Sequence, residues 1–292
     1  MKTEYVLITP AHNEEDLIEL VIRSVISQTI LPKKWVIVDD ASTDGTGKII
    51  RKYEARCDFI MYHRLQKLNT ESRYERRAYA FLGGYEQIKT LSYNFIAGLD
   101  ADISLEPKYY ECILEEFNKN PRLGIASGVY VDMIGNQLQK VQIDMNHTPG
   151  AMQMFRRQCY EQIGGYIPQK YGGDDSCAEI MARMKGWETR SFSQYEVVHY
   201  RPVGTSDGKS VLQARFNQGL TEYAVATHPL FMLAKSLRRA FLEKPYFMAS
   251  LARLVGFIYG YGLREERKIS PEVIRYVRKE QIRRLVYFLC RH

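Results

Sequence analysis

The chain has 292 residues, of which 45% are hydrophobic and 12% aromatic, a composition that excludes a largely disordered protein. Its net charge of +7 is uneven, because residues 230–292 hold 14 Lys plus Arg against 5 Glu, and residues 1–229 hold 27 against 29 acidic residues. No C-x-x-C pair occurs, so neither a zinc site nor a disulfide framework is indicated, and we expect a reducing cytoplasm. The apolar run near the N-terminus is too short for a signal peptide.

Short apolar runs rich in β-forming residues occupy 4–9, 34–38, 58–62 and 93–98, and stretches with helical spacing separate them. This alternation predicts βαβ units with parallel strands. We expect one helix to start at Asn13, ahead of two glutamates, and another to hold Pro107 in its first turn. Beyond residue 123, two strand-like segments flank Gly135 and Asn136, which predicts a hairpin within a mixed sheet.

The segment WVIVDDASTDGTGKII, residues 35–50, crowds carboxylates behind an apolar run. A calcium loop is excluded, because the position that needs a bidentate Glu is Arg51. A dinucleotide fingerprint fits poorly, because Ile50 stands where a third small residue should allow close helix packing. The remaining interpretation places Asp39 and Asp40 at the carboxyl end of a parallel strand, where open α/β sheets bind ligands.

Asp100 and Asp102 follow the run at 93–98 with one residue between them. In an extended chain both side chains would point to the same side, about 6 to 7 Å apart, so one cation could be shared. Such hard oxygen ligands suit Mg²⁺ or Mn²⁺. The alternative is an ordinary pair of aspartates in a turn.

Five segments occur in the order and spacing seen in a known family, namely VLITPAHNEE, VIVDDASTDGT, GLDADISLEP, MFRRQCYEQIGGY and GGDDSCAEIMARMKGW. With these motifs, residues 4–200 resemble family 2 glycosyltransferases, which have the α/β GT-A fold. The resemblance implies an enzyme that uses a nucleotide-diphospho-sugar, with a UDP-sugar favoured and GDP or TDP as alternatives, and that inverts the anomeric carbon. The last third of the chain is not covered by it.

The resemblance also implies roles for single residues at the donor side. Pro10, Ala11, Asn13 and Glu14 look like the first nucleotide-contacting loop, and Asp40 looks like the carboxylate that recognises the base or ribose. Alternatively, Asp40 or Asp44 caps the helix that begins near Thr46, and for Asp44 we favour capping.

Asp100 and Asp102 look like the D-x-D motif of the fold, in which the second carboxylate binds Mn²⁺ or Mg²⁺ and the first lies nearer the ribose. His199 stands where a histidine often completes such a metal site, although a lone histidine is as often structural. Arg201 and Arg215 could meet phosphate oxygens.

The GGDD motif looks like the family's acidic pair before a helix that Gly186 closes. It implies that Asp175 is the catalytic base, with Asp174 as its neighbour, unless both only favour the helix N-terminus. The sequence departs from the family pattern here, which usually has Glu at position 174 and an acidic residue at Cys177.

A second departure lies in LNTESRYERRAYAFLGGY, residues 68–85, which lacks the usual glycine-rich turn. Asn69 and Arg76 keep the family's spacing, so Arg76 is the candidate for contacting the nucleotide, with Arg73 and Arg77 as competitors. The segment IGGYIPQKYGG, residues 163–173, is either a mobile loop at the acceptor side or an ordinary connection.

Two segments of the basic tail, at 230–242 and 271–292, combine an apolar face with a cationic remainder, and the segment between them, 247–263, is the most apolar in the chain. Segment 247–263 is 17 residues long and contains Arg253, so it falls short of a comfortable membrane span. Such segments suit an anionic membrane surface, but packing on the catalytic domain or in a homodimer is equally compatible. We therefore predict a catalytic domain at 1–205 and a helical region at 206–292.

Together these expectations predict a cytoplasmic enzyme that is peripherally bound at the inner face of the membrane. It would transfer a sugar to a glycan, which we expect to be lipid-linked, in surface polysaccharide assembly, with no nucleic-acid partner. A sugar nucleotidyltransferase is the alternative enzyme, but its glycine-rich basic opening loop is absent after Leu7. A pseudoenzyme that binds nucleotide-sugar is the non-catalytic alternative, and the intact Asp102 and Asp175 argue against it.

Overall fold

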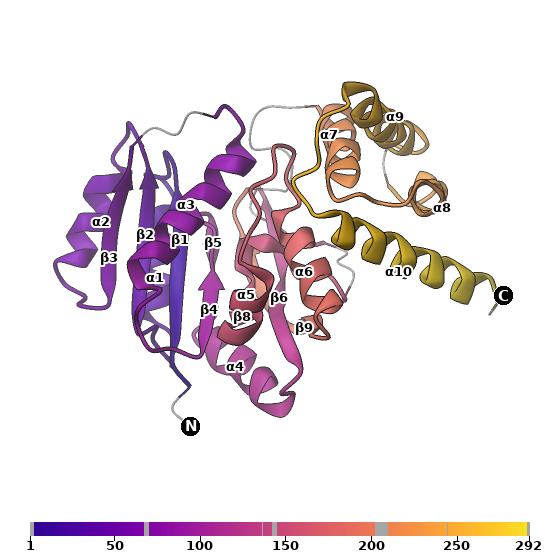
Figure 1. Cartoon of the computed structure of the whole chain (residues 1–292). Coiled ribbons are helices and arrows are strands. Elements are labelled where there is room, and N and C mark those ends of the chain that lie inside the picture. The colour runs from indigo at the N-terminus through magenta and orange to yellow at the C-terminus, as the bar shows by residue number, and fades with distance from the viewer. Residues whose placement is uncertain are drawn as a thin grey trace.

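The computed structural model describes residues 3–66, 70–135, 137–141, 145–201, 210–243 and 245–290. It forms one curled, mixed β-sheet with helices on both faces and a cluster of C-terminal helices at one side (Figure 1). The strands are β1 (Tyr5–Ala11), β2 (Lys34–Asp40), β3 (Ile60–Leu65), β4 (Phe95–Gly98), β5 (Ile103–Ser104), β6 (Leu123–Ile134), β7 (Gln137–Lys140), β8 (Met154–Arg156) and β9 (Glu188–His199).

The helices of the sheet half are α1 (Ile18–Ile26), α2 (Thr46–Glu54), α3 (Arg73–Ile88), α4 (Tyr109–Lys119), α5 (Arg157–Ile163) and α6 (Asp174–Met184), with a short 3₁₀ turn at Gly150–Met152. The strand order is β3-β2-β1-β4-β8-β6-β9-β5, and β7 pairs with β6. The first four of these strands are parallel, as the sequence predicted, whereas β8 runs antiparallel to both β4 and β6. The parallel order therefore breaks beside β4, next to the residues of the site.

Alternating apolar residues along the parallel strands build a core on each face of the sheet. Tyr5 and Leu7 of β1 belong to one cluster, whereas Val6 and Ile8 belong to the other. The first cluster contains buried residues of α1 and α4, and the second contains residues of α3, α5 and α6. The sheet is thus buried on both sides, which fixes the positions of its strand ends.

Two predicted helix starts are wrong by a few residues, because the expected residues are engaged elsewhere. Asn13 has a left-handed backbone (φ 54°) and its Oδ1 accepts from the Thr43 amide, so α1 begins only at Ile18. The Pro107 carbonyl accepts from the Thr29 amide, and α4 begins two residues later, at Tyr109. The prediction that Gly186 closes α6 is confirmed by its φ of +87° just beyond the C-cap.

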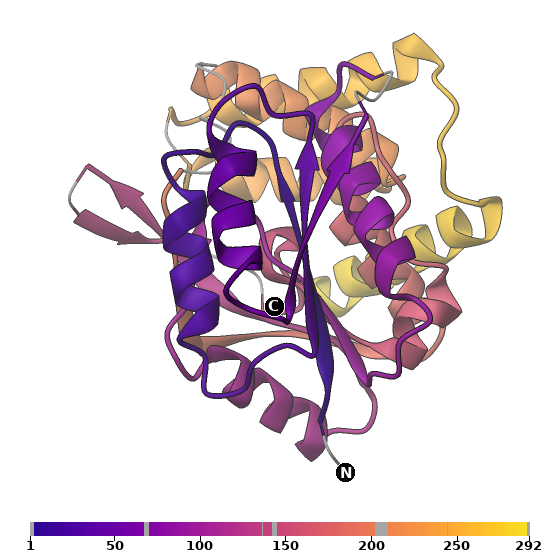
Figure 2. The ribbon, with the colours of Figure 1, turned by 90° about the vertical axis from the view of Figure 1, so that its left-hand side faces the viewer.

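The predicted hairpin is confirmed by antiparallel pairing of β6 with β7, and it projects from the body of the protein (Figure 2). Gly135 has a φ of +61° at the turn, a conformation that favours glycine, while Asn136 lies outside the described residues. The second strand is shorter than expected, because β7 ends at Lys140.

The described residues of the C-terminal region form the helices α7 (Val211–Ala224), α8 (Pro229–Ala240), α9 (Met248–Leu263) and α10 (Pro271–Leu289). α7 packs closely on α9, and α10 returns to the sheet half, where Val273 and Val277 join the second core cluster. An ion pair of 2.8 Å between Arg183 Nε and Glu280 Oε1 holds α10 on α6. The predicted division at residue 205 falls outside the described residues and stays a prediction.

None of the helices in the described part of the chain is both long enough and apolar enough to cross a membrane. In α9, Arg253 is fully buried, and its Nη2 binds Gln218 of α7 and Glu243 of the α8–α9 connection. The most apolar segment of the chain therefore carries a buried charge that ties three parts of the C-terminal region together.

Candidate active site

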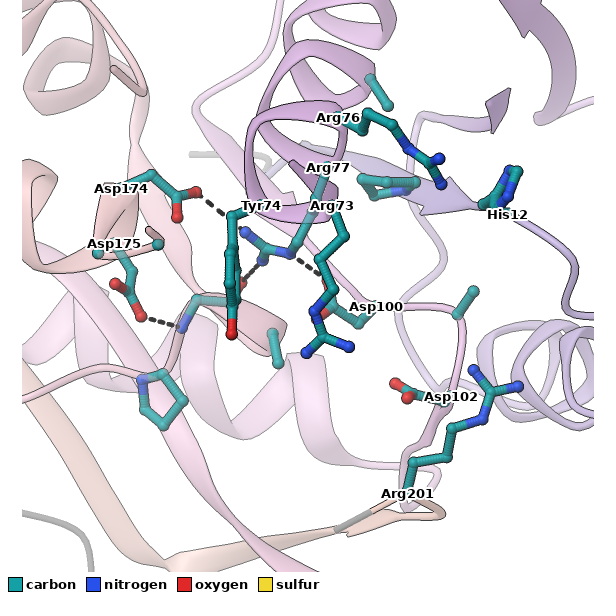
Figure 3. Close-up of a pocket in the computed structure, with 18 of the residues that line it drawn as sticks. His12, Arg73, Tyr74, Arg76, Arg77, Asp100, Asp102, Asp174, Asp175 and Arg201 are labelled. Atoms are coloured by element: carbon teal, nitrogen blue, oxygen red, sulfur yellow. Dashed lines mark hydrogen bonds and ion pairs between the residues drawn. The ribbon is translucent and has the colours of Figure 1, made fainter. Parts of the chain in front are cut away.

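A cavity of about 810 Å³ lies at the carboxyl ends of β1, β2 and β4, between the sheet half and α7. Loops that follow these strands supply one wall, and the N-terminal turns of α3 and α6 supply another (Figure 3). Eleven of the candidate residues predicted from the sequence line this cavity: Pro10, Ala11, Asn13, Glu14, Asp40, Arg76, Asp100, Asp102, Asp174, Asp175 and His199. Motifs far apart in the sequence thus meet around one space.

The two aspartates at the end of β2 have different surroundings, because successive side chains of a strand point to opposite faces. Asp39 is fully buried, and its oxygens accept hydrogen bonds from the Ser42 amide (2.7 Å), the Tyr62 hydroxyl (2.6 Å) and Arg64 (2.7 Å). Asp40 lines the cavity, where Arg76 Nε lies 2.9 Å from its Oδ2. Asp39 is therefore structural, and Asp40 is the carboxylate available to a ligand.

The neighbouring loop residues are tied to one another by their polar side chains. Asp44 Oδ1 accepts from the Thr46 amide at 3.0 Å, which supports the helix-capping interpretation of Asp44. The Asn13 amide donates to the Ser42 hydroxyl at 3.0 Å, so the loops after β1 and β2 are held together. Asn69, the partner expected for Arg76, lies outside the described residues.

Glu14 and Arg201 pair across the cavity wall, where Arg201 Nη1 donates to Glu14 Oε1 at 2.6 Å. Burial raises the pKa of Glu14 to about 7, although Arg201 acts in the opposite direction. Figure 3 shows Arg201, which follows the end of β9, beside Asp102.

Asp100 and Asp102 do not lie on an extended strand, because β4 already ends at Gly98. The prediction that an extended strand points both aspartates to the same side is therefore wrong, because these residues lie in a turn that leads into β5. Both side chains nevertheless line the cavity. Burial, and then the nearby charge of Asp100, raise the pKa of Asp102 above its usual value.

His199 is held between two carboxylates. Its Nδ1 lies 2.8 Å from Asp132 Oδ1 on the paired strand β6, and its Nε2 lies 3.7 Å from Asp102 Oδ2. When Nδ1–H donates to Asp132, the lone pair of Nε2 points toward Asp102, the arrangement found behind metal-binding histidines. Within the described ranges, no group of three or more His, Cys, Asp or Glu side chains is arranged to hold a metal ion.

At the other end of the cavity, Arg77 joins two of the candidate carboxylates. Its Nε donates to Asp100 at 2.8 Å, its Nη1 to Asp174 at 3.0 Å, and its Nη2 to the Gly150 carbonyl. Burial alone would lower the pKa of Arg77, but the two carboxylates raise it above the usual value. Burial raises the pKa of Asp174 to about 6 despite the adjacent guanidinium.

Asp175 is held differently from its neighbour. Its Oδ2 accepts from the Gly150 amide at 3.1 Å and its Oδ1 from the Ser176 amide at 2.7 Å. No Lys, Arg or His among the described residues forms an ion pair with it. Since each oxygen keeps a further lone pair and the side chain lines the cavity, Asp175 could accept a proton from a bound hydroxyl.

Several lining residues were not predicted from the sequence. Asn217, Gln218 and Thr221 come from α7, whose weak amphipathic pattern gave no functional signal. Asp132 could have been noticed as an aspartate within an otherwise apolar strand, which indicates a buried partner. Arg215, suggested as a phosphate ligand, does not line the cavity, because its side chain turns toward Gln218 and Glu243.

Comparison with known proteins identifies the family to which this chain belongs. A sequence model of the family described as Glycosyl transferase family 2 matches residues 6–176, so this chain belongs to that family. The prediction of a glycosyltransferase is thereby confirmed, and the nucleotidyltransferase and pseudoenzyme alternatives are not supported.

Curated relatives include poly-beta-1,6-N-acetyl-D-glucosamine synthases. The synthase of Staphylococcus epidermidis is 25% identical over 210 residues, which cover 65% of this chain and 46% of the relative. The synthase of Staphylococcus aureus (strain MSSA476) is 32% identical over 119 residues, 40% of this chain and 26% of the relative. The matches thus span less than half the length of these relatives.

Solved structures confirm the predicted GT-A fold. Mannosyltransferase PcManGT from Pyrobaculum calidifontis, in complex with GDP-Man and Mn²⁺, superposes with a TM-score of 0.64 at 16% identity, covering 90% of this chain and 88% of that one. Residues 1–349 of S. aureus TarS, in complex with UDP-GlcNAc, give a TM-score of 0.58 at 17% identity, covering 94% and 78%.

Proposed function

We propose that this glycosyltransferase moves a sugar, with inversion, from a nucleotide-diphospho-sugar to a hydroxyl of a glycan acceptor in cell-surface polysaccharide biosynthesis. The observation that carries the proposal is the asymmetry of the cavity. The carboxylates at its donor end are paired with arginine or histidine, whereas Asp175 at the opposite end is held, among the described residues, by backbone amides alone.

The donor would bind along the loops that follow β1 and β2. Asp40 and Arg76 would contact the base and ribose, with Pro10, Ala11, Asn13 and Glu14 lining the same end. A carboxylate that accepts an N–H of the base discriminates between nucleobases, because an unpaired buried donor costs about 1 to 3 kcal/mol. UDP-GlcNAc in TarS supports a UDP-sugar, which we favour, while GDP-Man in PcManGT keeps GDP as an alternative beside TDP.

The donor set fits a divalent cation, Mn²⁺ or Mg²⁺. Asp102 offers a carboxylate and His199 an imidazole nitrogen oriented by Asp132, and both ligand types suit Mn²⁺. Two protein ligands leave positions for water and for diphosphate oxygens, which is how such ions are usually held beside phosphates. When bound, the ion would stabilise negative charge on the leaving diphosphate. Asp100, predicted as a further ligand, binds Arg77 through Oδ1, so only its other oxygen remains for the ion or ribose.

Asp175 would act as the base. As the bond between the anomeric carbon and the diphosphate breaks, the acceptor oxygen attacks from the opposite face and its proton passes to Asp175. Asp174 is buried and bound to Arg77, so it would position this arginine rather than take the proton itself. α7 and Tyr171–Gly173 would form the wall on the acceptor side.

The acceptor and its location are further parts of the proposal. A lipid-linked glycan on the inner face of a membrane fits the basic C-terminal region, and the five free cysteines fit a reducing cytoplasm. A homodimer through the C-terminal helices is the alternative use of that region. The named synthases support polysaccharide assembly as the setting.

Binding of the donor can be tested without knowing the acceptor. Thermal unfolding would be followed with UDP-, GDP-, TDP- and CMP-sugars, each with and without Mn²⁺, because a ligand that binds only the native state raises its stability. We expect one nucleotide class to raise the melting temperature only with the ion present. No shift with any nucleotide-sugar would contradict the proposal.

A further inference from the structure

Helices α8 and α9 each bury one large apolar side chain, Met232 or Phe257, beside small residues, and expose most of their other large apolar side chains. In α8, Met232, Ser236 and Ala240 are buried, whereas Leu230, Leu233 and Leu237 are 46% to 59% exposed. This is the reverse of the pattern that a surface helix shows in water, where the large apolar face packs inward.

The same inversion occurs in α9. Its buried side includes Ala249, Ser250 and Gly256 beside Arg253 and Phe257, while Leu251, Val255 and Ile258 are 48% to 66% exposed. The spacing of four and three residues places these three on one stripe of the helix. Both helices therefore expose large apolar side chains on their outer face.

The connection between the two helices continues the apolar surface. Phe241 and Phe247 are 69% and 60% exposed, and their rings pack edge to face with centroids 5.1 Å apart. Phe247 has a φ of +60°, a conformation that non-glycine residues rarely adopt and that no burial of its ring explains. We call these two phenylalanines, together with the exposed stripes of α8 and α9, the α8–α9 ridge.

The backbones of α7 and α9 approach closely at glycines, which fixes the orientation of α9. A Cβ on Gly219 of α7 would lie 2.1 Å from the Arg253 carbonyl, and one on Gly256 of α9 would lie 2.0 Å from the Phe216 carbonyl. α7 in turn lines the cavity with Asn217 and Thr221. The ridge is therefore fixed to a wall of the site, at the end of the molecule far from β3 (Figure 1).

The charge of this segment indicates what covers the ridge. Residues 229–263 hold five cations, Lys235, Arg238, Arg239, Lys244 and Arg253, and Glu243 as the single acidic residue. Arg253 is buried, and Lys235 and Arg239 pair with Glu222 and Glu243, whereas Arg238 is exposed on α8. A second copy docked ridge to ridge would bring two cationic surfaces together, and a desolvated interface disfavours like charges. An anionic bilayer instead offers opposite charge at its headgroups and an apolar layer beneath them.

We infer that the α8–α9 ridge is the surface by which this protein lies on an anionic lipid bilayer, with Phe241 and Phe247 entering the boundary between headgroups and acyl chains. Large apolar residues outside and small residues at the helix contacts are the pattern of helices packed in lipid. The inference rests on the membrane association proposed above and assigns it to α8 and α9 rather than to α10, whose Val273 and Val277 are buried in the core.

The test is cosedimentation of the full chain with vesicles of phosphatidylcholine alone or mixed 3:1 with phosphatidylglycerol, without any sugar donor. We expect binding to the mixed vesicles, reduced about tenfold or more in Phe241→Ser/Ile258→Ser, since two large apolar groups are lost from the contact. The matched control is Leu20→Ser/Leu138→Ser, which removes two exposed apolar side chains elsewhere and should bind like the wild type.

A second variant tests the same contact by fluorescence, without removing an apolar side chain. Phe241→Trp should show a blue-shifted emission on mixed vesicles, quenched by brominated acyl chains, beyond the signal of wild-type protein. Equal binding of the ridge variant and the control, or no quenching of Phe241→Trp, would overturn the inference. So would a wild-type dimer that does not bind vesicles and that Phe241→Ser/Ile258→Ser converts to monomer.

Donor-induced thermal shifts of the same proteins separate this result from the proposed reaction. The ridge variant should keep the wild-type shift, because none of its changed residues lines the cavity. Lost vesicle binding with an intact shift supports the ridge, whereas intact vesicle binding in the ridge variant contradicts it whatever the shift.

Discussion

The two ends of the cavity hold their carboxylates in contrasting ways. At the donor end, Asp40 faces Arg76, and Glu14 pairs with Arg201. At the other end, Asp174 shares Arg77 with Asp100, and within the described part of the chain Asp175 accepts only from the amides of Gly150 and Ser176. A carboxylate paired with a guanidinium is held in place and suits binding, whereas one without a cation is freer to take a proton. Neighbouring Asp174 and Asp175 thus differ in role because of their partners.

The largest effect should come from Asp175→Asn, which keeps the shape of the side chain but cannot accept a proton. We expect transfer to fall by about 10² to 10⁴, while donor binding measured by thermal shift stays unchanged. Asp174→Asn should slow transfer less. If Asp174→Asn proves the slower enzyme, the roles of the two carboxylates are reversed.

Next in size is the loss of Arg77, whose removal would leave Asp100 and Asp174 without their shared cation. Breaking a buried ion pair in this way typically costs 3 to 5 kcal/mol, so Arg77→Met should lower the free energy of unfolding by roughly that amount. Arg76→Met, which loses one ion pair of similar exposure rather than two, should cost less, about 1 kcal/mol. Urea unfolding of both variants makes the comparison, and equal losses would show that Arg77 is not the link between the two ends.

The metal site offers a graded test at the donor end. Asp102→Ala should weaken Mn²⁺-dependent donor binding by about 100-fold, and Asp132→Asn, which acts only through His199, by about tenfold. Titration calorimetry with and without Mn²⁺ measures both. Full Mn²⁺-dependent affinity in Asp102→Ala would remove this residue from the site.

The smallest effect concerns the pH dependence of stability through Glu14. Its pKa is about 7 in the folded protein, against 4.5 for an unperturbed group, so the native state keeps a proton that the unfolded chain releases. The stability that the protonated Glu14 gives the native state is fully present below pH 4.5 and is lost as the pH rises toward 7. Between pH 5 and 8, the free energy of unfolding of the wild-type protein should therefore fall by on the order of 2 kcal/mol more than that of Glu14→Gln. Parallel stability curves for the two proteins would contradict the raised pKa.

Much of the donor end could be predicted from the sequence, because its residues follow short strands in ordered motifs. Asp40 and Asp102 stand at fixed positions after apolar runs, and the carboxyl ends of parallel strands meet at one edge. The link through Arg77 could not be predicted in this way. Arg73, Arg76 and Arg77 stand within one helical turn, and only the packing of α3 against the sheet decides which guanidinium points to which carboxylate.

The C-terminal region was harder to predict for a different reason. An amphipathic helix pattern shows that a face is apolar, but does not show whether that face turns inward or outward. The sequence left Leu233 and Leu237 open between a packing face and a membrane face, and the structure exposes them because Met232 and Ser236 are buried instead. Close contact at Gly219 and Gly256 sets this choice, and it depends on residues distant in the sequence.

The central claim, an inverting reaction with Asp175 as the base, is tested most directly by the configuration of the first sugar released. With the α-linked nucleotide-sugar that gives the largest thermal shift, slow hydrolysis by water in place of the acceptor would be followed by proton NMR before the free sugar equilibrates. We predict that the β anomer forms first and that Asp175→Asn abolishes its formation. Initial release of the α anomer, or unchanged release of β by Asp175→Asn, would contradict the account.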